Sequence, residues 1–374
     1  MTEFFNYANL TWPEIADLPR HTPLVIPLGE GFTPDYLTDV MEAPDKIGIL
    51  PAIPFGWRGS GLDVSDELIS KLIENLLSSL RDDGFNRVFA LAPQGVDLGL
   101  GLQVLKQPEK NRLHVNSLFP DDSHKSKVVL IPIGHTEQHA FHLPMETDTL
   151  IIDAVARGVC AQIPGEAVQI PVMPYGVSTH RAAFAGTLNC GGRAFEDFWL
   201  GIIENLVRRG FTKFYFLSGH GGNGSFLNNI VKYAGERFLQ TFIATSWLYL
   251  SGPHGIEVLG KYRQSKIGGM GHAGELETSL ILHLRPDLVH MDRVVDETDF
   301  ITTPSYYMDW VEGGALNANP PWEDDTRTGA YGAGSLGTVQ KGEVWLHAAI
   351  DEKISHVGEI NEQYTRRLRK RGLA

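Results

Sequence analysis

Residues 128–148 read Val-Val-Leu-Ile-Pro-Ile-Gly-His-Thr-Glu-Gln-His-Ala-Phe-His-Leu-Pro-Met-Glu-Thr-Asp. The apolar start predicts a buried strand, which Pro132 and Gly134 end. Imidazole and carboxylate side chains follow at Glu137, His139, His142 and Asp148. In open α/β sheets, sites form beyond the carboxyl ends of the strands, and this ligand mixture suits zinc, manganese or iron. A polar surface loop rich in histidine is the alternative, and this stretch alone leaves both interpretations open.

Composition limits the class of protein. The chain has 374 residues, 43% of them apolar and 21% charged, which is ordinary for a globular protein. The net charge of −13 opposes broad contact with phosphates and therefore disfavours nucleic acid as a partner. The basic run 366–371 is expected at the end of a last helix, where it complements the helix dipole, rather than as a binding tail.

Two cysteines, Cys160 and Cys190, form no CxxC motif and no disulfide framework, which favours a reducing cytoplasm. The amino terminus lacks a basic segment followed by an apolar one, and no run approaches the ~18 apolar residues of a membrane span. We therefore expect a soluble cytoplasmic protein without a membrane partner.

The first part of the chain predicts alternating strands and helices. The expected strands are 24–28, 49–53 and 88–91, and a helix is expected over 68–80, between Ser65 and Gly84. Such alternation predicts a parallel sheet with crossover helices.

Short matches in the same order suggest an internal duplication. The matched segments are 26–29 with 131–134, 51–56 with 171–176, and 73–76 with 203–206. Glu137 and His139 then align with Phe32 and Pro34, so the first copy has lost the ligands. We predict a degenerate α/β half at 1–105, a polar linker at 106–127 and a ligand-bearing domain at 128–374.

Later ligands also stand at expected strand ends. The predicted strands are 167–172, 214–217 and 242–249, and the predicted helices are 149–160, 194–209, about 275–283 and 344–371, the last being one helix or a pair. Segment 251–270 is expected to be an irregular flap. His220 lies among four glycines, and Glu275 and Glu277 lie in the first turn of a helix. A glycine-rich turn and acids that only complement the helix dipole are the alternatives.

These motifs resemble the creatininase (creatinine amidohydrolase) family. The resemblance is carried by Gly134-His135-Thr136-Glu137-Gln138-His139, His142-Leu143-Pro144, Thr147-Asp148, Ser178-Thr179-His180, Gly186-Thr187, Gly219-His220-Gly221-Gly222-Asn223 and His272-Ala273-Gly274-Glu275-Leu276-Glu277-Thr278-Ser279. It implies a three-layer α/β/α fold with a mostly parallel sheet and a centre of two divalent metal ions, zinc in the first place, with manganese or iron as alternatives. It also implies a homo-oligomer.

The resemblance also implies roles for individual residues. One metal would take Glu137, Asp148 and His220, and the other His139 and the bridging Asp148. Creatininase has a glutamate where this chain has Gly222, so we expect Glu275 to fill that position, supported by Glu277. His272 would be the general acid/base, with Glu277 beside it, while Ser178 and Trp247 would contact the substrate. A second aromatic residue of creatininase has no match within 266–271.

The expected function is hydrolysis of a C–N bond in a small, polar, cyclic amide. Two cations sharing Asp148 would lower the pKa of a bridging water, which would attack the carbonyl. A hydrolase of carbon–carbon bonds in an inositol-derived cyclic ketone is an alternative, with Asp299, Asn317 and Asn319 as candidates to bind hydroxyl groups. A non-catalytic protein that kept the fold is a second alternative.

Overall fold

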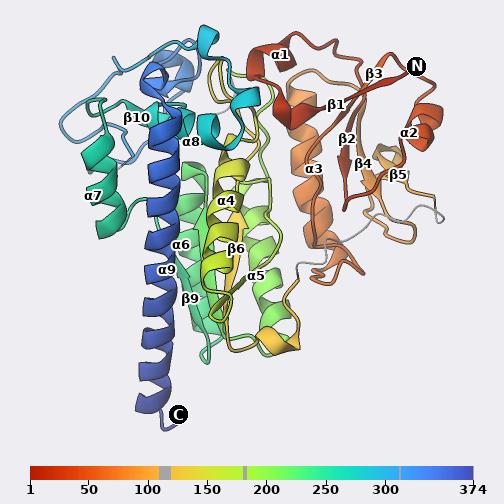
Figure 1. The fold of residues 1–374 in the computed structure, drawn as a ribbon. Coiled ribbons are helices and arrows are strands. Elements are labelled where there is room, and N and C mark those ends of the chain that lie inside the picture. Colours follow the sequence, from red (N-terminus) through yellow and green to blue (C-terminus); the bar gives the residue numbers. More distant parts are fainter. Residues whose placement is uncertain (109–118, 180–182, 311–312, 374) are drawn as a thin grey trace.

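The computed structural model describes residues 1–108, 119–179, 183–310 and 313–373 (Figure 1). Part of the predicted linker and His180 of the Ser-Thr-His motif lie outside these residues. None of the helices in the described ranges has the length and apolarity that a bilayer crossing demands. The chain forms an α/β fold with two parallel sheets, one in each predicted half.

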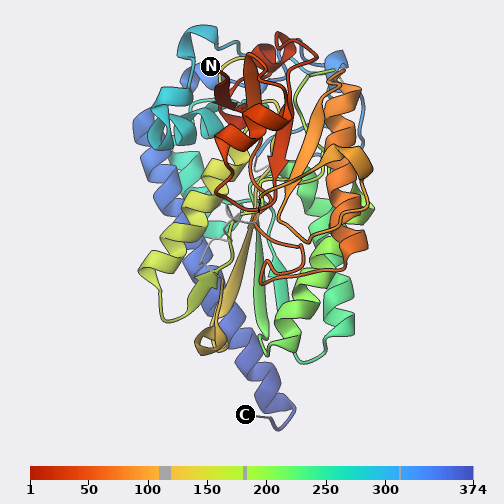
Figure 2. The same cartoon turned by 90° about the vertical axis from the view of Figure 1, so that its right-hand side faces the viewer.

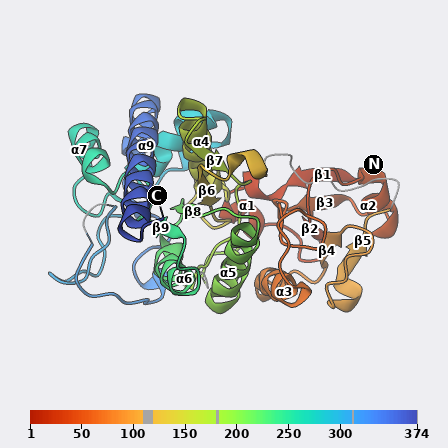
Figure 3. The ribbon, with the colours of Figure 1, turned by 90° about the horizontal axis from the view of Figure 1, so that it is seen from below.

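The sheet of the C-terminal half carries the predicted site. Its strands stand in the order β7-β6-β8-β9, namely Ala167–Gln169, Val128–Ile133, Lys213–Ser218 and Phe242–Thr245. Four long helices cover it: α4 (Thr147–Gln162), α5 (Gly192–Arg208), α6 (Gly224–Arg237) and α9 (Val339–Lys370). Figure 3 shows α4 and α9 on one face of this sheet and α5 and α6 on the other. The three-layer arrangement is therefore confirmed.

Strand β6 explains why both faces are covered. All its residues are buried. Val128 and Leu130 join the apolar cluster formed with α4 and α9, while Val129, Ile131 and Ile133 join the cluster formed with α5. Successive side chains of a strand point to opposite faces, so an unbroken apolar run fits a strand buried on both sides.

The N-terminal half has the strand order β1-β3-β2-β4-β5. These strands are Glu3–Asn6, Lys46–Ile49, Leu24–Pro27, Val88–Ala92 and Val104–Lys106, and the helices are α1 (Trp12–Ala16), α2 (Pro34–Val40) and α3 (Asp66–Asp82). The strand expected at 49–53 lies earlier, at Lys46–Ile49, and only Ile53 makes a bridge, to Leu28. In Figure 2 this half faces the viewer.

The two sheets share a connection pattern. Each sheet contains four strands whose order across the sheet is the second, first, third and fourth of the group along the chain: β3-β2-β4-β5 and β7-β6-β8-β9. In the first sheet Gly29 N–H donates to Ile53 O and Ile53 N–H to Pro27 O; in the second, Gly134 N–H donates to Met173 O and Met173 N–H to Pro132 O. These are the segments matched in the sequence, so the geometry agrees with the predicted duplication, which stays a prediction.

The halves share one apolar core. Helix α3 packs against α5, its counterpart in the sequence match, and Figure 3 shows the two helices side by side. One buried cluster joins Leu72 and Leu76 of α3 to Phe198 and Ile202 of α5 and continues into both sheets. The fully buried aromatic rings in this cluster make separation of the halves costly, because each large apolar side chain contributes roughly 1.5–3 kcal/mol on burial.

Within the described ranges, two α-helices and two short strands follow β9 in the chain before α9 begins, and two of these elements carry residues of the predicted site. The four elements are α7 (Pro253–Tyr262), α8 (Glu275–Leu284), β10 (Met270–His272) and β11 (Tyr331–Gly332), the last two forming an antiparallel pair. The prediction of an irregular 251–270 was wrong for α7. Glu352 of α9 accepts hydrogen bonds from the backbone N–H groups of Gly252 and Gly255 and so caps this helix from about 100 residues away. The predicted closing helix is single and long, and its end extends beyond the rest of the molecule (Figures 1 and 2).

Candidate metal centre

Loops after β6 and β8 bring the candidate ligands together. Glu137 and His139 lie in the segment after β6, Asp148 lies in the first turn of α4, and His220 follows β8. A Cβ at Gly219 would lie 2.3 Å from the carbonyl oxygen of Asp148, so glycine is needed for this close approach. Glu137, His139, Asp148, His220 and His272 are all buried.

Three histidines turn one ring nitrogen outward to a backbone carbonyl and the other inward to a carboxylate. His139 Nδ1–H donates to Glu137 O at 3.1 Å, His220 Nε2–H to Val177 O at 3.0 Å and His272 Nε2–H to Gln138 O at 2.7 Å. These outward bonds assign the tautomers. Each inward nitrogen then faces an acid: His220 Nδ1 lies 2.9 Å from Glu137 Oε1, and His272 Nδ1 lies 3.7 Å from the same atom. A lone pair and a carboxylate so close need a proton or a cation between them.

Asp148 lies between two of these histidines. Its Oδ1 is 3.2 Å from His139 Nε2, and its Oδ2 is 3.3 Å from His220 Nδ1. The carboxylate thus turns one oxygen toward each imidazole. The buried set of oxygen and nitrogen donors around it suits divalent first-row metals.

Electrostatics in the metal-free cluster favour protons on two histidines. Burial alone would lower the pKa of His139, but the carboxylates of Asp148 and Glu277 outweigh it and raise that pKa to about 9. Glu137 and Asp148 likewise outweigh burial and raise the pKa of His220. Burial and the neighbouring His139 instead lower the pKa of His272 to about 3. Imidazolium protons therefore occupy positions that cations would take, since metal ligands must lose their protons.

Glu275 does not lie in this cluster, in contrast to its predicted role as a ligand. Its carboxylate contacts Lys341 Nζ at 2.5 Å and accepts hydrogen bonds from the backbone N–H groups of Gln264 and Ser265. Glu277 faces the centre instead: its Oε2 lies 3.9 Å from His139 Nε2 and accepts from Ala273 N–H at 2.6 Å. Residues two apart on a helix point in different directions, so only one of the two acids can face the ligands. Burial raises the pKa of Glu277 to about 7.

His272 is held in place by its strand and by neighbouring loops. It pairs with Tyr331 in the β10–β11 ladder. Gln138 Nε2 donates to Gly329 O at 2.9 Å, which connects the segment after β6 to the loop just before β11. The ring of Trp322 lies edge-on to His272 at 5.0 Å. Segment 266–271 has no aromatic residue to match the family's, and the aromatic ring beside His272 comes from a segment about 50 residues later in the chain.

The two predicted substrate contacts lie near His220. Ser178 is buried, and its hydroxyl has no hydrogen-bond partner among the described residues. It follows Val177, whose carbonyl accepts from His220. Trp247 is half-exposed, and its ring lies against the turn of Gly221 and Gly224. Their roles toward a substrate stay predictions.

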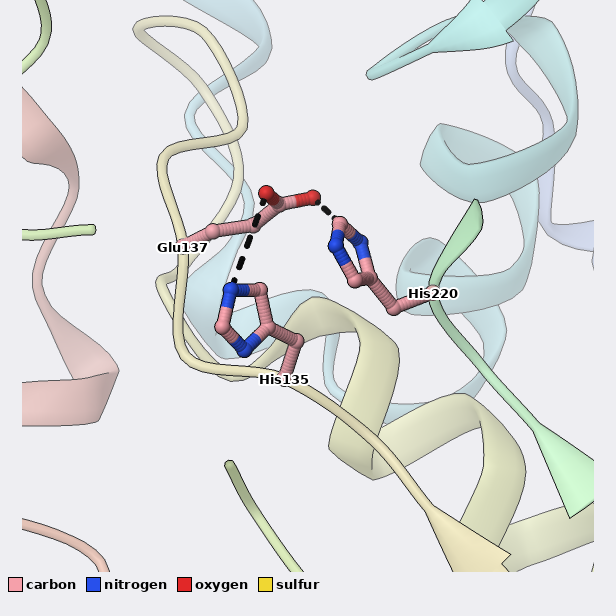
Figure 4. A group of neighbouring side chains, drawn as sticks. All are labelled: His135, Glu137 and His220. Carbon is pink, nitrogen blue, oxygen red and sulfur yellow. Dashed lines mark ion pairs between the residues drawn. The ribbon is translucent and has the colours of Figure 1, made fainter. Parts of the chain in front are cut away.

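Two further polar groups at the centre were not predicted. His135 lies 4.0 Å from Glu137 through its Nε2, and Figure 4 shows both His135 and His220 beside the Glu137 carboxylate. Tyr249 is fully buried, and its hydroxyl has no partner among the described residues. Burial, together with the charges of Glu277 and Asp148, raises the pKa of this hydroxyl. Its neighbours Leu248 and Leu250 both have positive φ, a strain that concentrates at functional sites. His135 lies two residues before Glu137 in the ligand segment, and this closeness in sequence is the signal that could have indicated it.

The N-terminal half braces the ligand segment. Leu10 O and Ala8 O accept hydrogen bonds from the backbone N–H groups of Met145 and Glu146. The ring of Trp12 packs on Phe141 at 5.5 Å and on Phe184 at 5.4 Å, and its indole N–H donates to Thr328 O at 2.8 Å. Trp12 therefore joins three segments that surround the cluster.

We expect Trp12→Ala to weaken metal binding as well as stability. The loss of the ring contacts and the hydrogen bond should cost about 2 kcal/mol in unfolding free energy. Phe4→Ala is the control, because Phe4 is a partly buried aromatic of the same half that packs on Phe32. Thermal unfolding and zinc titration of both variants check the prediction. Equal zinc affinity in the two variants would show that the brace is only structural.

Comparison with known proteins agrees with this geometry. The pattern of the creatininase family, described as creatinine amidohydrolase, matches residues 118–357. The chain belongs to the creatininase family. Creatinine amidohydrolase from Pseudomonas putida is 31% identical over 192 residues, which cover 48% of this chain and 72% of that protein. The mycofactocin precursor peptide peptidase of Mycobacterium ulcerans is 33% identical over 173 residues, covering 44% of this chain and 62% of the peptidase.

A third relative and the solved structures widen the comparison. 3-Dehydro-scyllo-inosose hydrolase from Thermotoga maritima is 26% identical over 254 residues, 63% of this chain and 78% of the relative. A manganese creatininase structure superposes with a TM-score of 0.52 at 24% identity, covering 65% of this chain and 93% of the other. That likeness supports the creatininase fold. Family membership identifies the chain as a metal-dependent hydrolase.

Proposed function

We propose that this chain binds two divalent metal ions in the buried cluster and hydrolyses a C–N bond of a small, polar, cyclic amide. The observation that carries the proposal is the convergence of three imidazole lone pairs on Glu137 and Asp148, with the outward nitrogen of each ring donating to a backbone carbonyl. Zinc is the first candidate, with manganese as the second, because imidazole and carboxylate ligands accept both.

Two sets of ligands share one carboxylate in this proposal. Glu137, Asp148 and His220 would hold one ion, and His139, Asp148 and Glu277 would hold the other. Glu277 thus takes the role that the sequence assigned to Glu275. Bound there, the ions would supply a nucleophilic water near neutral pH and polarise the substrate carbonyl.

The chain's own residues would then move the proton and hold the substrate. His272 keeps its Nε2–H on Gln138 O, so its free Nδ1 faces the cluster and can accept a proton from water and deliver it to the leaving nitrogen. The unpartnered hydroxyl of Ser178 is available to bind a polar group of the substrate. The rings of Trp247 and Trp322 border the centre, and such faces suit a small planar ring.

The test combines metal content with a substrate panel. Protein purified without chelator should contain about two zinc or manganese ions per chain. The loaded protein should hydrolyse creatinine or another five- or six-membered cyclic amide, and chelation should remove this activity until metal is restored. Wild-type protein that binds neither metal would contradict the proposal and favour a non-catalytic protein that kept the fold.

A second candidate is hydrolysis of a carbon–carbon bond in an inositol-derived cyclic ketone. The match to the Thermotoga maritima hydrolase is the longest of the three relatives described above. Asn319 Nδ2 donates to Thr179 O at 3.3 Å, which brings one of the predicted hydroxyl-binding residues next to Ser178. The same loaded protein should be assayed with 3-dehydro-scyllo-inosose. Turnover of this ketone without turnover of any cyclic amide would favour the second candidate.

A further inference from the structure

His135 shares the buried centre with the proposed ligands but differs from them in its hydrogen bonding. Its Nδ1 accepts a hydrogen bond from the backbone N–H of Gly176 at 2.9 Å. In His139, His220 and His272, by contrast, the outward ring nitrogen donates a hydrogen bond to a backbone carbonyl. In a neutral imidazole one nitrogen carries the proton and the other accepts. The proton of His135 therefore lies on Nε2, the atom that faces Glu137 Oε2 at 4.0 Å.

The surroundings of Gly176 fix this assignment. The N–H of Val177 donates to Asn223 Oδ1 at 3.0 Å, and Gly176 O accepts from Cys190 N–H at 2.9 Å. A Cβ at position 176 would lie 2.3 Å from Asn223 Oδ1, so a glycine is required there. The main chain of His135 is held by Thr149 Oγ1–H, which donates to its carbonyl at 3.1 Å. Neither the N–H of Gly176 nor the main chain of His135 can therefore rotate away from this arrangement.

A metal on Nε2 of His135 would need the proton to move to Nδ1. That proton would then point at the N–H of Gly176, and the two donors would repel. His135 Nε2 also has no hydrogen-bond partner among the described residues, although the side chain is fully buried. Its ring lies against that of His220 with 4.3 Å between centroids and a tilt of 32° between the ring planes.

We infer that His135 is a positioning residue and not a metal ligand: it directs a fixed Nε2–H at Glu137 Oε2. Across 4.0 Å the N–H dipole attracts this oxygen without a hydrogen bond, and it favours the carboxylate orientation in which the other oxygen, Oε1, faces His220 and His272. This inference rests on the proposed metal centre for its effect, but the tautomer of His135 can be measured without metal. Loss of a residue that supports a metal ligand from outside commonly changes metal affinity by about 10- to 100-fold.

Three substitutions separate positioning from coordination and from packing. His135→Gln can place an amide N–H where Nε2 lies, His135→Asn reaches only the position of Nδ1, and His135→Phe fills the space without a donor. We expect zinc affinity, measured by chelator competition, to fall by about 10- to 100-fold in the Phe and Asn variants and to recover in the Gln variant. The number of imidazole ligands seen by X-ray absorption should be the same in all four proteins.

Contrary outcomes are specific. Loss of one imidazole ligand in His135→Phe would make His135 a ligand and overturn the inference, as would unchanged affinity in all three variants. Nitrogen-15 spectra of histidine-labelled, metal-free wild type should show His135, assigned by its absence in His135→Gln, protonated on Nε2. A proton on Nδ1 would overturn the inference even if the wild type bound no metal. Failure of the proposed function would instead appear as absence of metal from wild type with the Nε2–H tautomer intact.

Discussion

Asp148→Asn should reduce the metal content from about two ions per chain to well below one and remove nearly all hydrolytic activity. The asparagine has one acceptor oxygen where aspartate has two, so it cannot serve both His139 and His220, which now face separate oxygens. Loss of several kcal/mol of transition-state stabilisation corresponds to a fall in kcat/KM of about a thousandfold or more.

Asp153→Asn on the same helix is the matched control. Asp153 forms a surface pair with Arg157 at 2.6 Å, and a surface pair contributes at most about 1 kcal/mol. Elemental analysis and thermal unfolding with and without zinc compare the two variants. Zinc should raise the melting temperature of wild type and Asp153→Asn but not that of Asp148→Asn. Full metal content in Asp148→Asn would exclude the shared carboxylate.

The second large effect distinguishes the neighbouring acids of α8. Glu277→Gln should lower metal content to about one ion per chain and reduce activity strongly, with little loss of stability. A buried carboxyl beside Asp148 and Glu137 is repelled when ionised, and burial already raises the pKa of Glu277 to about 7. Glutamine is the neutral amide analogue of this carboxyl, so the substitution removes a metal ligand without leaving a buried charge unpaired.

Glu275→Gln should lower the stability of the protein and leave its metal content unchanged. Lys341 would lose its carboxylate partner in a nearly buried pair, and breaking such a pair costs about 3 kcal/mol or more. Metal content should stay at the wild-type level. Chemical denaturation and elemental analysis of both variants measure the two effects. Loss of metal in Glu275→Gln, with normal content in Glu277→Gln, would restore the assignment made from the sequence.

The sequence predicted the sheet of the C-terminal half and the segments that surround the cluster, because long apolar strands and amphipathic helices leave strong local patterns. It could not choose between Glu275 and Glu277, since that choice depends on Lys341, 66 positions away along the chain. The same limit explains why the sequence did not predict α7: its amino terminus is capped by Glu352, which belongs to another helix.

Other differences come from short elements and from hydrogen-bond direction. Helix α1 has five residues and β5 has three, too few for a periodic pattern to stand out. The role inferred for His135 depends on which of its nitrogens meets the Gly176 N–H, and a spacing rule carries no such information. A motif identifies residue types that can bind a metal, but partners elsewhere in the fold decide which atom of each faces it.

Under the predicted duplication, the packing of α3 against α5 has a consequence for how the two copies diverge. Two separate subunits meeting through equivalent helices must find each other by diffusion, and every substitution appears on both sides of their contact. Here a single chain holds both helices, so their association is intramolecular, with an effective concentration in the millimolar range for short linkers, whatever the dilution. Each side can also mutate independently. Phe32 can thus occupy the position that aligns with Glu137 while the other half retains its acids.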